Sequence, residues 1–181
     1  MVPRHPQLLD ASRSRLVVID VQERFVPAMD AIDPVLANIE HLAASAADCD
    51  VPVVATEQVP SKLGATIPPL RNLLPEPFQK SAFSAAAAIE SDDDGRRDQI
   101  VICGIEAHVC VLQTAFDALA AGLSPVVVSD AITSRTPASK TAAVARLLWA
   151  GIDVATTEMI LFEWLAGADH PAFREVSRRI R

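Results

Sequence analysis

Residues 99–122 decide the fold, and they read QIVICGIEAHVCVLQTAFDALAAG. The apolar run at 99–103 is continuous instead of alternating, which is typical of a parallel strand buried on both faces. After a short polar turn, apolar residues recur with helical spacing until Gly122, and glycine favours helix ends. These apolar residues are Val109, Leu112, Phe116 and Leu119. The stretch predicts a buried strand that passes directly into an amphipathic helix.

The same pattern of a β-branched run followed by a helical stretch recurs along the chain. The other runs are LVVI at 16–19, VPVVA at 51–55, PVVVS at 125–129 and a weaker one, IDVA at 152–155. One helix is expected to open at Asp33-Pro34, since proline favours the first turn, and another to end at Gly151. Strands that alternate with helices imply right-handed crossovers. The residues alone predict an α/β fold, a parallel sheet of five strands covered by helices.

Length and charge limit the number of domains and the class of partner. At ~150 residues per domain, 181 residues predict one domain over 1–181. Half of the residues are apolar, so the chain has enough material for a sizeable buried core. Sixteen basic and 23 acidic residues give a net charge of −7, which repels a phosphate backbone. We expect no nucleic-acid partner.

Cysteine usage and the N-terminal sequence bear on the compartment. The chain has an odd number of cysteines, without the short paired spacing of a disulfide framework or a metal knuckle: Cys49, Cys103 and Cys110. Residues 1–15 contain prolines, arginines and an aspartate, and they lack the apolar core of a signal peptide. No run approaches the ~20 apolar residues that cross a bilayer. We expect a soluble, cytoplasmic protein with no membrane partner.

Chemistry in an open α/β sheet is expected just after the strands, where their carboxyl ends meet. Asp20 ends the first strand, and its carboxylate fits a general base, a metal ligand or a simple turn cap. Cys110 lies in the first turn of the helix that follows the strand at 99–103. The positive end of the helix dipole favours a thiolate there, so Cys110 fits a nucleophile. A small buried apolar residue is the alternative for this cysteine.

Lys80 lies after a proline-rich segment, between Phe78 and Phe83. A solvated surface lysine is the ordinary interpretation. A partly buried ammonium between two phenylalanines would need a carboxylate partner, and Asp20 would supply one. Lys80 is therefore a candidate partner of Asp20.

Other reactive side chains receive structural interpretations. Cys49 and Cys103 fit small buried apolar residues. His108 lies two positions before Cys110, which puts the two side chains on different faces of a helical turn. We interpret His108 as a surface or pocket-wall residue and not as a base.

Motifs for nucleotides, metals and serine nucleophiles are absent. The six glycines form neither GxGxxG nor GxxxxGK, and no GxSxG elbow is present. The four histidines are scattered without HExxH spacing. We expect no metal and no other cofactor. The proline-rich segment 60–77 is expected to be a long excursion across an edge of the sheet.

Five segments resemble, in their order, the isochorismatase-like cysteine hydrolases, the superfamily that includes nicotinamidases and N-carbamoylsarcosine amidohydrolases. The segments are VIDVQ at 18–22, TEQ at 56–58, QKSAFS at 79–84, GIEAHVCVLQT at 104–114 and VSDA at 128–131. The resemblance covers about residues 14–165. Segments TEQ and GIEAHVCV are most similar to the branch called isochorismatase domain-containing proteins, whose substrates are largely unassigned.

The resemblance implies a three-layer α/β/α fold with a six-stranded parallel sheet and a triad of Asp20, Lys80 and Cys110. It also implies a cis peptide bond between Ile105 and Glu106, which would aim the backbone N–H groups of Glu106 and Cys110 at one point as an oxyanion hole. In this scheme Cys110 attacks the carbonyl of a small amide or related C–N substrate, and Asp20 moves the protons. Lys80 keeps Asp20 ionised and offsets the charge of a forming thiolate.

The pocket around this triad is expected to include Phe25, Glu57, Gln58 and Phe83, although packing explains both phenylalanines equally well. Nicotinamidases carry a metal-binding aspartate and histidines where this chain has the TEQ segment, so we expect neither that metal nor that activity. Isochorismatases proper lack the nucleophilic cysteine. Cys110 therefore favours amide hydrolysis over vinyl-ether cleavage.

Other roles and partners stay open at this point. The alternatives to a cysteine hydrolase are a non-catalytic binding or regulatory protein on the same scaffold and hydrolysis of an isochorismate-like substrate. The expected partners are a small-molecule substrate and further copies of the chain, because the resemblance implies a homo-oligomer, a dimer or larger. Trp149 and Trp164 are expected in the core, with an oligomer surface as the alternative.

Overall fold

Two of the continuous apolar runs form strands that are buried along their whole length. In the computed structural model, which describes residues 4–92 and 95–180, β1 (Ser14–Ile19) and β4 (Gln99–Ile105) have no exposed residue. The two strands pair in parallel from Ser14↔Gln99 to Ile19↔Gly104. Burial on both faces is the reason that these segments lack the alternation of a half-exposed strand.

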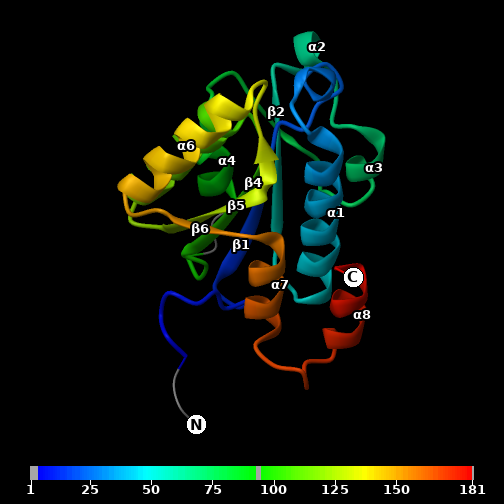
Figure 1. Cartoon of the computed structure of the whole chain (residues 1–181), viewed down its shortest axis with the longest axis vertical. Helices are drawn as coiled ribbons and strands as arrows, with labels where there is room; N and C mark the ends of the chain where they lie inside the picture. Colours follow the sequence, from blue (N-terminus) through cyan, green and yellow to red (C-terminus); the bar gives the residue numbers. More distant parts are fainter. Residues whose placement is uncertain (1–3, 93–94, 181) are drawn as a thin grey trace.

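Six parallel strands make one sheet, in the order β3-β2-β1-β4-β5-β6 (Figure 1). The other four strands are β2 (Val53–Gln58), β3 (Phe78–Lys80), β5 (Ser124–Thr133) and β6 (Asp153–Ala155). Every neighbouring pair is parallel. The predicted α/β fold with a six-stranded parallel sheet is therefore confirmed.

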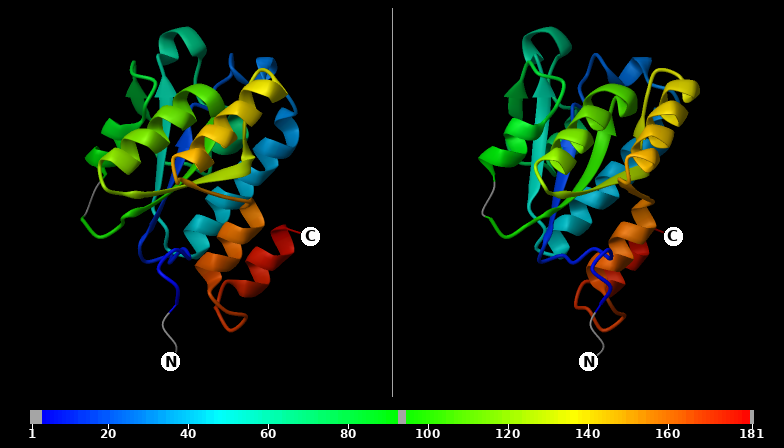
Figure 2. Two further views of the ribbon diagram at one scale, coloured as in Figure 1. Left: turned by 60° about the vertical axis from the view of Figure 1, so that its left-hand side comes forward. Right: turned by 90° about the vertical axis from the view of Figure 1, so that its left-hand side faces the viewer.

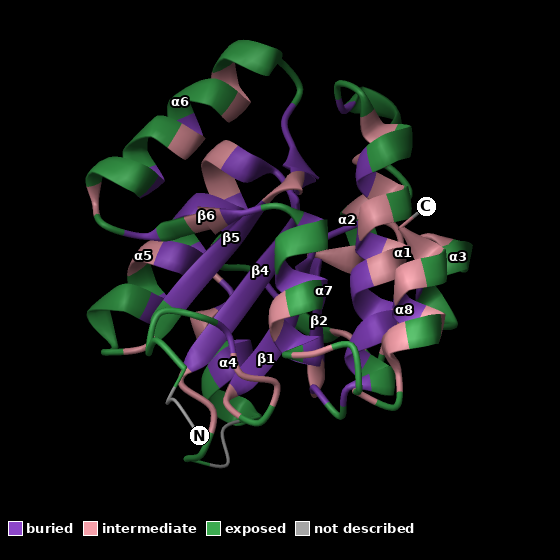
Figure 3. Cartoon of the chain, turned by 60° about the horizontal axis from the view of Figure 1, so that its bottom comes forward, coloured by how far each residue is buried: buried purple, intermediate pink, exposed green. Residues whose placement is uncertain are grey.

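Helices cover both faces of the sheet (Figure 2). One face, here called the α1 face, packs against α1 (Ile32–Asp48), α3 (Pro68–Arg71), α7 (Thr157–Leu165) and α8 (Phe173–Arg179). The opposite face, here called the α5 face, packs against α4 (Ala86–Ser91), α5 (Leu112–Ala120) and α6 (Pro137–Trp149). Figure 3 shows the strands as the buried layer between these helices.

Three short turns of helix complete the described chain. They are the 3-10 helix η1 (Val26–Ala28), α2 (Pro60–Leu63) and the π-helix η2 (Ala107–Val111). Within residues 4–92 and 95–180, no helix is both long enough and apolar enough to span a bilayer.

The strand order places a topological switch point between β1 and β4. From β1 the chain builds β2 and β3 on one side, and it then returns to add β4, β5 and β6 on the other side. The connection after β1 runs towards β2, and the connection after β4 runs in the opposite direction, towards β5. These diverging connections open a crevice beyond the carboxyl ends of β1 and β4. Asp20 follows β1, and η2 with Cys110 follows β4. Both residues therefore lie where an open α/β sheet binds its ligands.

Strand β3 is the strand that the residue pattern alone did not predict. It has three residues at the edge of the sheet, and both Phe78 and Gln79 are exposed. Such a short edge strand carries no continuous apolar run, so only the family resemblance predicted a sixth strand. Strand β2 also ends later than its apolar run, because it continues through Gln58.

The proline-rich segment 60–77 connects β2 to β3 at this edge, and it is more structured than a loop. It contains α2 and α3, and Leu70 is fully buried among the residues of the α1 face. Thr66 forms an antiparallel bridge with Gln22, just beyond β1. The segment is thereby anchored over the α1 face.

The two tryptophans differ in their environments. Trp164 is 2% exposed and lies in the core, as predicted. Trp149 is 90% exposed, so the prediction of a core position is wrong for this residue. Ala143 and Leu147, four positions apart, form the buried side of α6, and Trp149 comes two positions later, on a different side of the helix.

Candidate active site

Asp20 is completely buried at the carboxyl end of the sheet. Along β1, Val17 and Ile19 belong to the α5 face, and continued alternation would turn residue 20 to the α1 face. The backbone at Asp20 is left-handed instead (φ 52°), a conformation that aspartate tolerates better than most residues. The chain leaves the strand here, and the carboxylate meets Thr56 and Lys80.

Gly104 lets β4 approach β1 closely just before Asp20. Its φ is +113°, and a Cβ added to it would lie 2.2 Å from the carbonyl oxygen of Ile19. Any side chain at this position would push the two strands apart. Glycine at position 104 therefore allows the end of β1, followed by Asp20, to lie close to the end of β4, which leads into the turn with Cys110.

Lys80 is the last residue of β3, and its side chain is 4% exposed. Its ammonium donates to Oδ2 of Asp20 at 2.7 Å and to Oε1 of Gln58 at 2.8 Å. The carbonyl oxygen of Phe83 accepts at 3.0 Å and that of Ala82 at 3.3 Å. Because each ammonium proton has an acceptor and one acceptor is a carboxylate, the buried charge is compensated. The carboxylate partner expected for Lys80 is thus present.

Thr56 and Gln22 support this ion pair, and the sequence prediction assigned neither of them a role. Thr56 Oγ1 donates to Oδ1 of Asp20 at 2.8 Å. The Gln22 amide bridges the backbone of Gln58, accepting from its N–H at 2.8 Å and donating to its carbonyl at 3.2 Å. Gln58, expected to line the pocket, directs its own amide to Lys80. Gln22 and Thr56 both lie inside segments that carry the family resemblance, and this position in the sequence could have indicated a role at the site.

Cys110 lies in η2, between β4 and α5, and is 3% exposed. The predicted first turn of the helix is therefore a π turn, a form found frequently at functional sites, and regular α-helix starts at Leu112. Thr114 Oγ1 donates to the Cys110 carbonyl at 2.7 Å and accepts from the Ala85 N–H at 2.9 Å. These bonds tie the turn to the residue before α4.

The surroundings of Cys110 keep its thiol protonated. Burial raises the pKa of Cys110 to about 12, and the charge of Asp20 and a hydrogen bond to Asp20 also raise it. The charge of Lys80 and a hydrogen bond from the Glu106 backbone N–H lower the pKa without offsetting burial. Desolvation of the sulfur and the charge of Asp20 thus both oppose the tendency of a helix end to favour a thiolate. A thiolate therefore forms only when a base accepts the proton, and Asp20 is the carboxylate that acts on this thiol.

The peptide bond between Ile105 and Glu106 is cis, and it joins β4 to η2. This is the position that the resemblance implied. The Glu106 backbone N–H lies near enough to the sulfur of Cys110 to lower the pKa of this thiol. The Glu106 carboxylate is buried and accepts from Nε of Arg135 at 2.9 Å. An oxyanion hole formed by the N–H groups of Glu106 and Cys110 stays a prediction.

The other residues expected to line the pocket are more dispersed. Phe25 is half-buried beside η1. The side chain of Phe83 is 53% exposed, and its backbone carbonyl accepts a hydrogen bond from Lys80. Glu57 lines a cavity that includes none of the three triad residues, so its expected place beside the triad is corrected. The reason is the alternation of β2, which turns Glu57 to the face opposite Gln58.

His108, Cys49 and Cys103 have surroundings that agree with their structural interpretations. His108 is partly exposed, and its Nδ1 lies 2.9 Å from Oγ of Ser134 and 4.0 Å from Oε2 of Glu106. Cys49 and Cys103 are buried, and burial raises the pKa of each thiol. Their interpretation as small buried residues is confirmed.

Residues of the TEQ segment already have protein partners. Thr56 donates to Asp20, Gln58 accepts from Lys80, and Glu57 accepts from Thr66. Across the part of the chain that the structure describes, no three histidine, cysteine or acidic side chains gather at metal-binding distances.

Comparisons with known proteins agree with this architecture. A family model described as the isochorismatase domain matches residues 14–159. The chain is 35% identical over 170 residues to isochorismatase domain-containing protein 2A of Mus musculus, covering 93% of this chain and 82% of that protein. It is similar to the MAR1 ribonuclease structure from Caenorhabditis elegans, with a TM-score of 0.91 and 34% identity over 95% of this chain and 91% of that one.

One further structure is similar in fold alone. The YcaC gene product of Escherichia coli, described as an octameric hydrolase of unknown specificity, has a TM-score of 0.76 and 20% identity. The match covers 99% of this chain and 98% of that one.

Proposed function

We propose that this chain, which belongs to the isochorismatase family, is a hydrolase that cleaves a C–N bond of a small molecule through a thioester on Cys110. The close approach of three reacting groups supports this function. Lys80 Nζ lies 2.7 Å from Asp20 Oδ2, and Asp20 is near enough to Cys110 to raise the pKa of its thiol. Acid, amine and sulfur meet beyond the carboxyl ends of β1 and β4, at the switch point of the sheet.

The first half of the proposed reaction forms the thioester. The sulfur of Cys110 attacks the substrate carbonyl carbon while its proton passes to Asp20, and the C=O electron pair becomes an oxyanion. The N–H groups of Glu106 and Cys110 bind this oxyanion. Asp20 then gives the proton to the nitrogen, the C–N bond breaks, and the amine leaves.

The second half hydrolyses the thioester. Asp20 takes a proton from water, and the oxygen attacks the thioester carbonyl. When the tetrahedral species collapses, the C–S bond breaks, the carboxylic acid leaves, and the sulfur recovers its proton from Asp20. The buried ammonium of Lys80 offsets the negative charge that passes among sulfur, carboxylate and oxyanion.

A panel of small primary amides and ureides, assayed for released ammonia, tests this proposal. Cys110→Ala is expected to abolish turnover, since loss of an essential nucleophile costs many orders of magnitude in rate. Cys49→Ala, at a buried cysteine outside the site, is the matched control and should retain activity. Ammonia release by Cys110→Ala at the rate of the unmodified protein would refute the scheme.

A thiol reagent separates the enzyme from the alternative of a binding or regulatory protein on the same scaffold. Intact-protein and peptide mass spectrometry after treatment with iodoacetamide measures which cysteine reacts first. Cys49 and Cys103 lie in the apolar core of the α1 face, whereas Cys110 lies where an open α/β sheet binds its ligands, so modification of Cys110 should come first. Equally slow modification of all three cysteines would favour the binding protein.

RNA cleavage is a second candidate, favoured by the likeness to the Caenorhabditis elegans ribonuclease. The net charge of −7 and a buried thiol fit a small neutral amide better than a polyanion. A fluorogenic RNA substrate distinguishes the two candidates. If the Cys110→Ala variant still cleaves RNA, the thiol takes no part in that reaction. An isochorismate-like vinyl ether is assayed in the same panel, because it is the remaining alternative substrate.

We also propose that the chain forms a homo-oligomer, as the Escherichia coli relative is described to do. Leu148 and Trp149, 57% and 90% exposed at the end of α6, give the isolated chain an apolar surface. Light scattering after size-exclusion chromatography measures the mass directly. A mass equal to one chain of 19.4 kDa would contradict this proposal.

A further inference from the structure

A cavity of about 460 Å³ lies between β2, β3 and the proline-rich segment 60–77. This volume falls within the ~300–1,000 Å³ of small-molecule sites. Its lining includes Glu57, Thr66 and Arg71 but not Asp20, Lys80 or Cys110. The cavity is therefore distinct from the proposed active site.

The alternation of β2 separates the cavity from the triad. Side chains of Thr56 and Gln58 reach Asp20 and Lys80, whereas the residue between them must point to the other side of the sheet. That residue is Glu57. Leu74, another lining residue, packs against the apolar cluster of the α1 face. The cavity thus opens on the α1 face.

Glu57 presents one unused carboxylate oxygen to this cavity. The residue is 6% exposed, and its Oε1 accepts both from the Thr66 N–H at 2.6 Å and from the Thr66 hydroxyl at 2.9 Å. Among the residues that the structure describes, none donates to Oε2, and Oε2 is not among the buried polar atoms sealed from solvent. A carboxylate oxygen that faces a cavity from a residue this buried is stabilised by a cationic hydrogen-bond donor.

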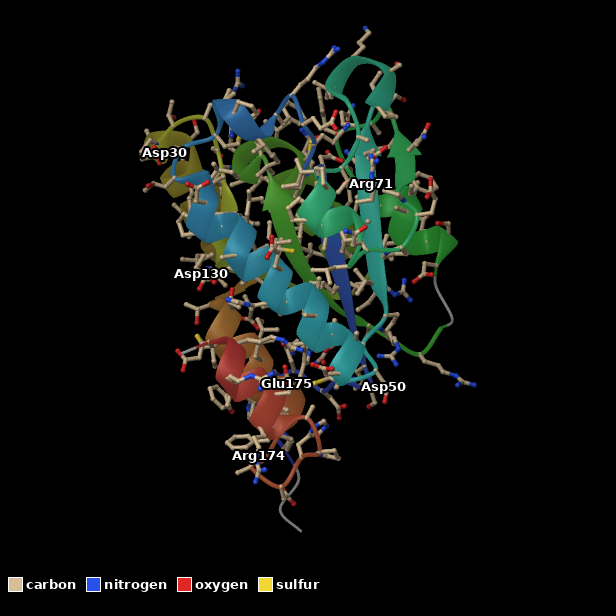
Figure 4. The ribbon with its side chains drawn as sticks, turned by 90° about the vertical axis from the view of Figure 1, so that its right-hand side faces the viewer. Asp30, Asp50, Arg71, Asp130, Arg174 and Glu175 are labelled. Atoms are coloured by element: carbon tan, nitrogen blue, oxygen red, sulfur yellow. The ribbon has the colours of Figure 1, made fainter. Side chains whose placement is uncertain are left out.

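Arg71 supplies a positive charge at the rim of the cavity. It ends α3, labelled in Figure 4, and it is exposed. No ion pair or hydrogen bond joins its guanidinium to another residue in the described part of the chain. The rest of the lining includes the aliphatic side chains of Leu74, Pro75 and Pro77 and the exposed polar residues Glu76 and Gln79. The cavity therefore combines the buried carboxylate of Glu57, the guanidinium of Arg71 and aliphatic walls, with Glu76 as a second, exposed carboxylate.

We propose that this cavity binds a small aliphatic molecule with a primary ammonium group at one end and a carboxylate at the other. The ammonium donates to Oε2 of Glu57, and the carboxylate pairs with the guanidinium of Arg71. The aliphatic middle contacts Leu74 and the two prolines. A carboxylate without an amine has no ammonium group to donate to Glu57, and an amine without a carboxylate has no anionic group to pair with Arg71.

Titration of the full chain by two-dimensional ¹H–¹⁵N NMR tests this site with defined probes. The probes are 4-aminobutanoate and 6-aminohexanoate, with butylammonium and butanoate as single-charge comparisons. A zwitterion should give saturable shifts that include the Thr66 N–H, since this group donates to Glu57. Butylammonium should bind at least about threefold more weakly, and butanoate should not saturate.

Two variants remove the proposed contacts without removing the packing. Glu57→Gln keeps an Oε1 acceptor for Thr66 but puts an NH₂ donor in place of Oε2, and it should weaken zwitterion binding at least about tenfold. Arg71→Gln, at an exposed position, should weaken the zwitterion at least about threefold and leave butylammonium unchanged. Asp50→Asn removes one carboxylate at the far end of β2 and is the matched control, expected to change nothing (Figure 4).

The outcomes are decisive in both directions. Absence of saturable shifts with both zwitterions, or an unchanged affinity in Glu57→Gln, would overturn the site. Equal affinity for butylammonium and the zwitterions would overturn the role of Arg71. Cys110→Ala should bind the probes like the unmodified chain, so failure here and failure of the proposed hydrolysis are distinguishable.

Discussion

Replacing Asp20 with asparagine should remove the proposed base and at the same time make the thiol of Cys110 more acidic. Asparagine tolerates the left-handed backbone at this position, and its Oδ1 can still accept from Thr56. Asp20 raises the pKa of Cys110 through its charge and its hydrogen bond, whereas Lys80 lowers it. In the variant only burial continues to raise this pKa strongly. Catalysis and thiol reactivity should therefore change in opposite directions.

The size of the effect follows from the position of the carboxylate. A neighbouring charge shifts a pKa by roughly 1–3 units, so the pKa of Cys110 should fall by about that amount from about 12. At pH 8 the fraction of Cys110 present as thiolate then rises about tenfold for each unit by which the pKa falls. Over the same unit the thiolate becomes about threefold less nucleophilic. The net increase in the rate of alkylation of Cys110 is roughly 3- to 30-fold.

Iodoacetamide in excess at pH 8, followed by peptide mass spectrometry, measures this rate. Asp50→Asn is the control, because Asp50 contributes to the raised pKa of Cys49 and not to that of Cys110. Circular dichroism checks that Asp20→Asn is folded. If Cys110 reacts in Asp20→Asn no faster than in the unmodified chain, Asp20 does not control the thiol proton, and the proposed mechanism loses its base.

Three other perturbations test the packing and the charges around the site. Lys80→Met leaves the Asp20 carboxylate buried without its ammonium and should lower the free energy of unfolding by about 3–5 kcal/mol in urea denaturation; a loss below about 1 kcal/mol would contradict the buried ion pair. Gly104→Ala forces a Cβ to within 2.2 Å of the Ile19 carbonyl oxygen at a φ of +113°, and thermal melting should report a loss of about 2–5 kcal/mol, whereas an unchanged melting temperature would mean that β1 and β4 can separate freely. For alkaline pH, the pKa of Cys110 is about 12 when folded and ~8.5 when unfolded. The native state then holds more protons, so the thiol's contribution to stability is complete below pH ~8.5 and is lost at up to about 1.4 kcal/mol per pH unit as the pH rises toward 12. Urea denaturation at pH 8, 9.5 and 11 should show a smaller loss for Cys110→Ala, and an identical pH dependence in both proteins would contradict the raised pKa.

The sequence alone was sufficient for the centre of the fold. Runs such as those of β1 and β4 have no alternation because both of their faces are buried, and this property is local to each segment. Asp20 and Cys110 could be singled out for the same reason, since Asp20 directly follows one such run and Cys110 lies in the helical turn after the other. Edge strand β3 could not be derived in this way, because a three-residue strand with two exposed residues has no apolar pattern of its own.

Only the tertiary structure decided which side chains meet and in which charge state. Lys80 becomes a partner of Asp20 because β3 and β1 flank β2, an arrangement set by strand order and not by spacing along the chain. Thiol acidity at Cys110 depends on desolvation by packed neighbours, which a local rule about helix ends does not include. Glu57 and Gln58 are adjacent in sequence yet serve opposite faces of the sheet, because successive residues of a strand point in opposite directions.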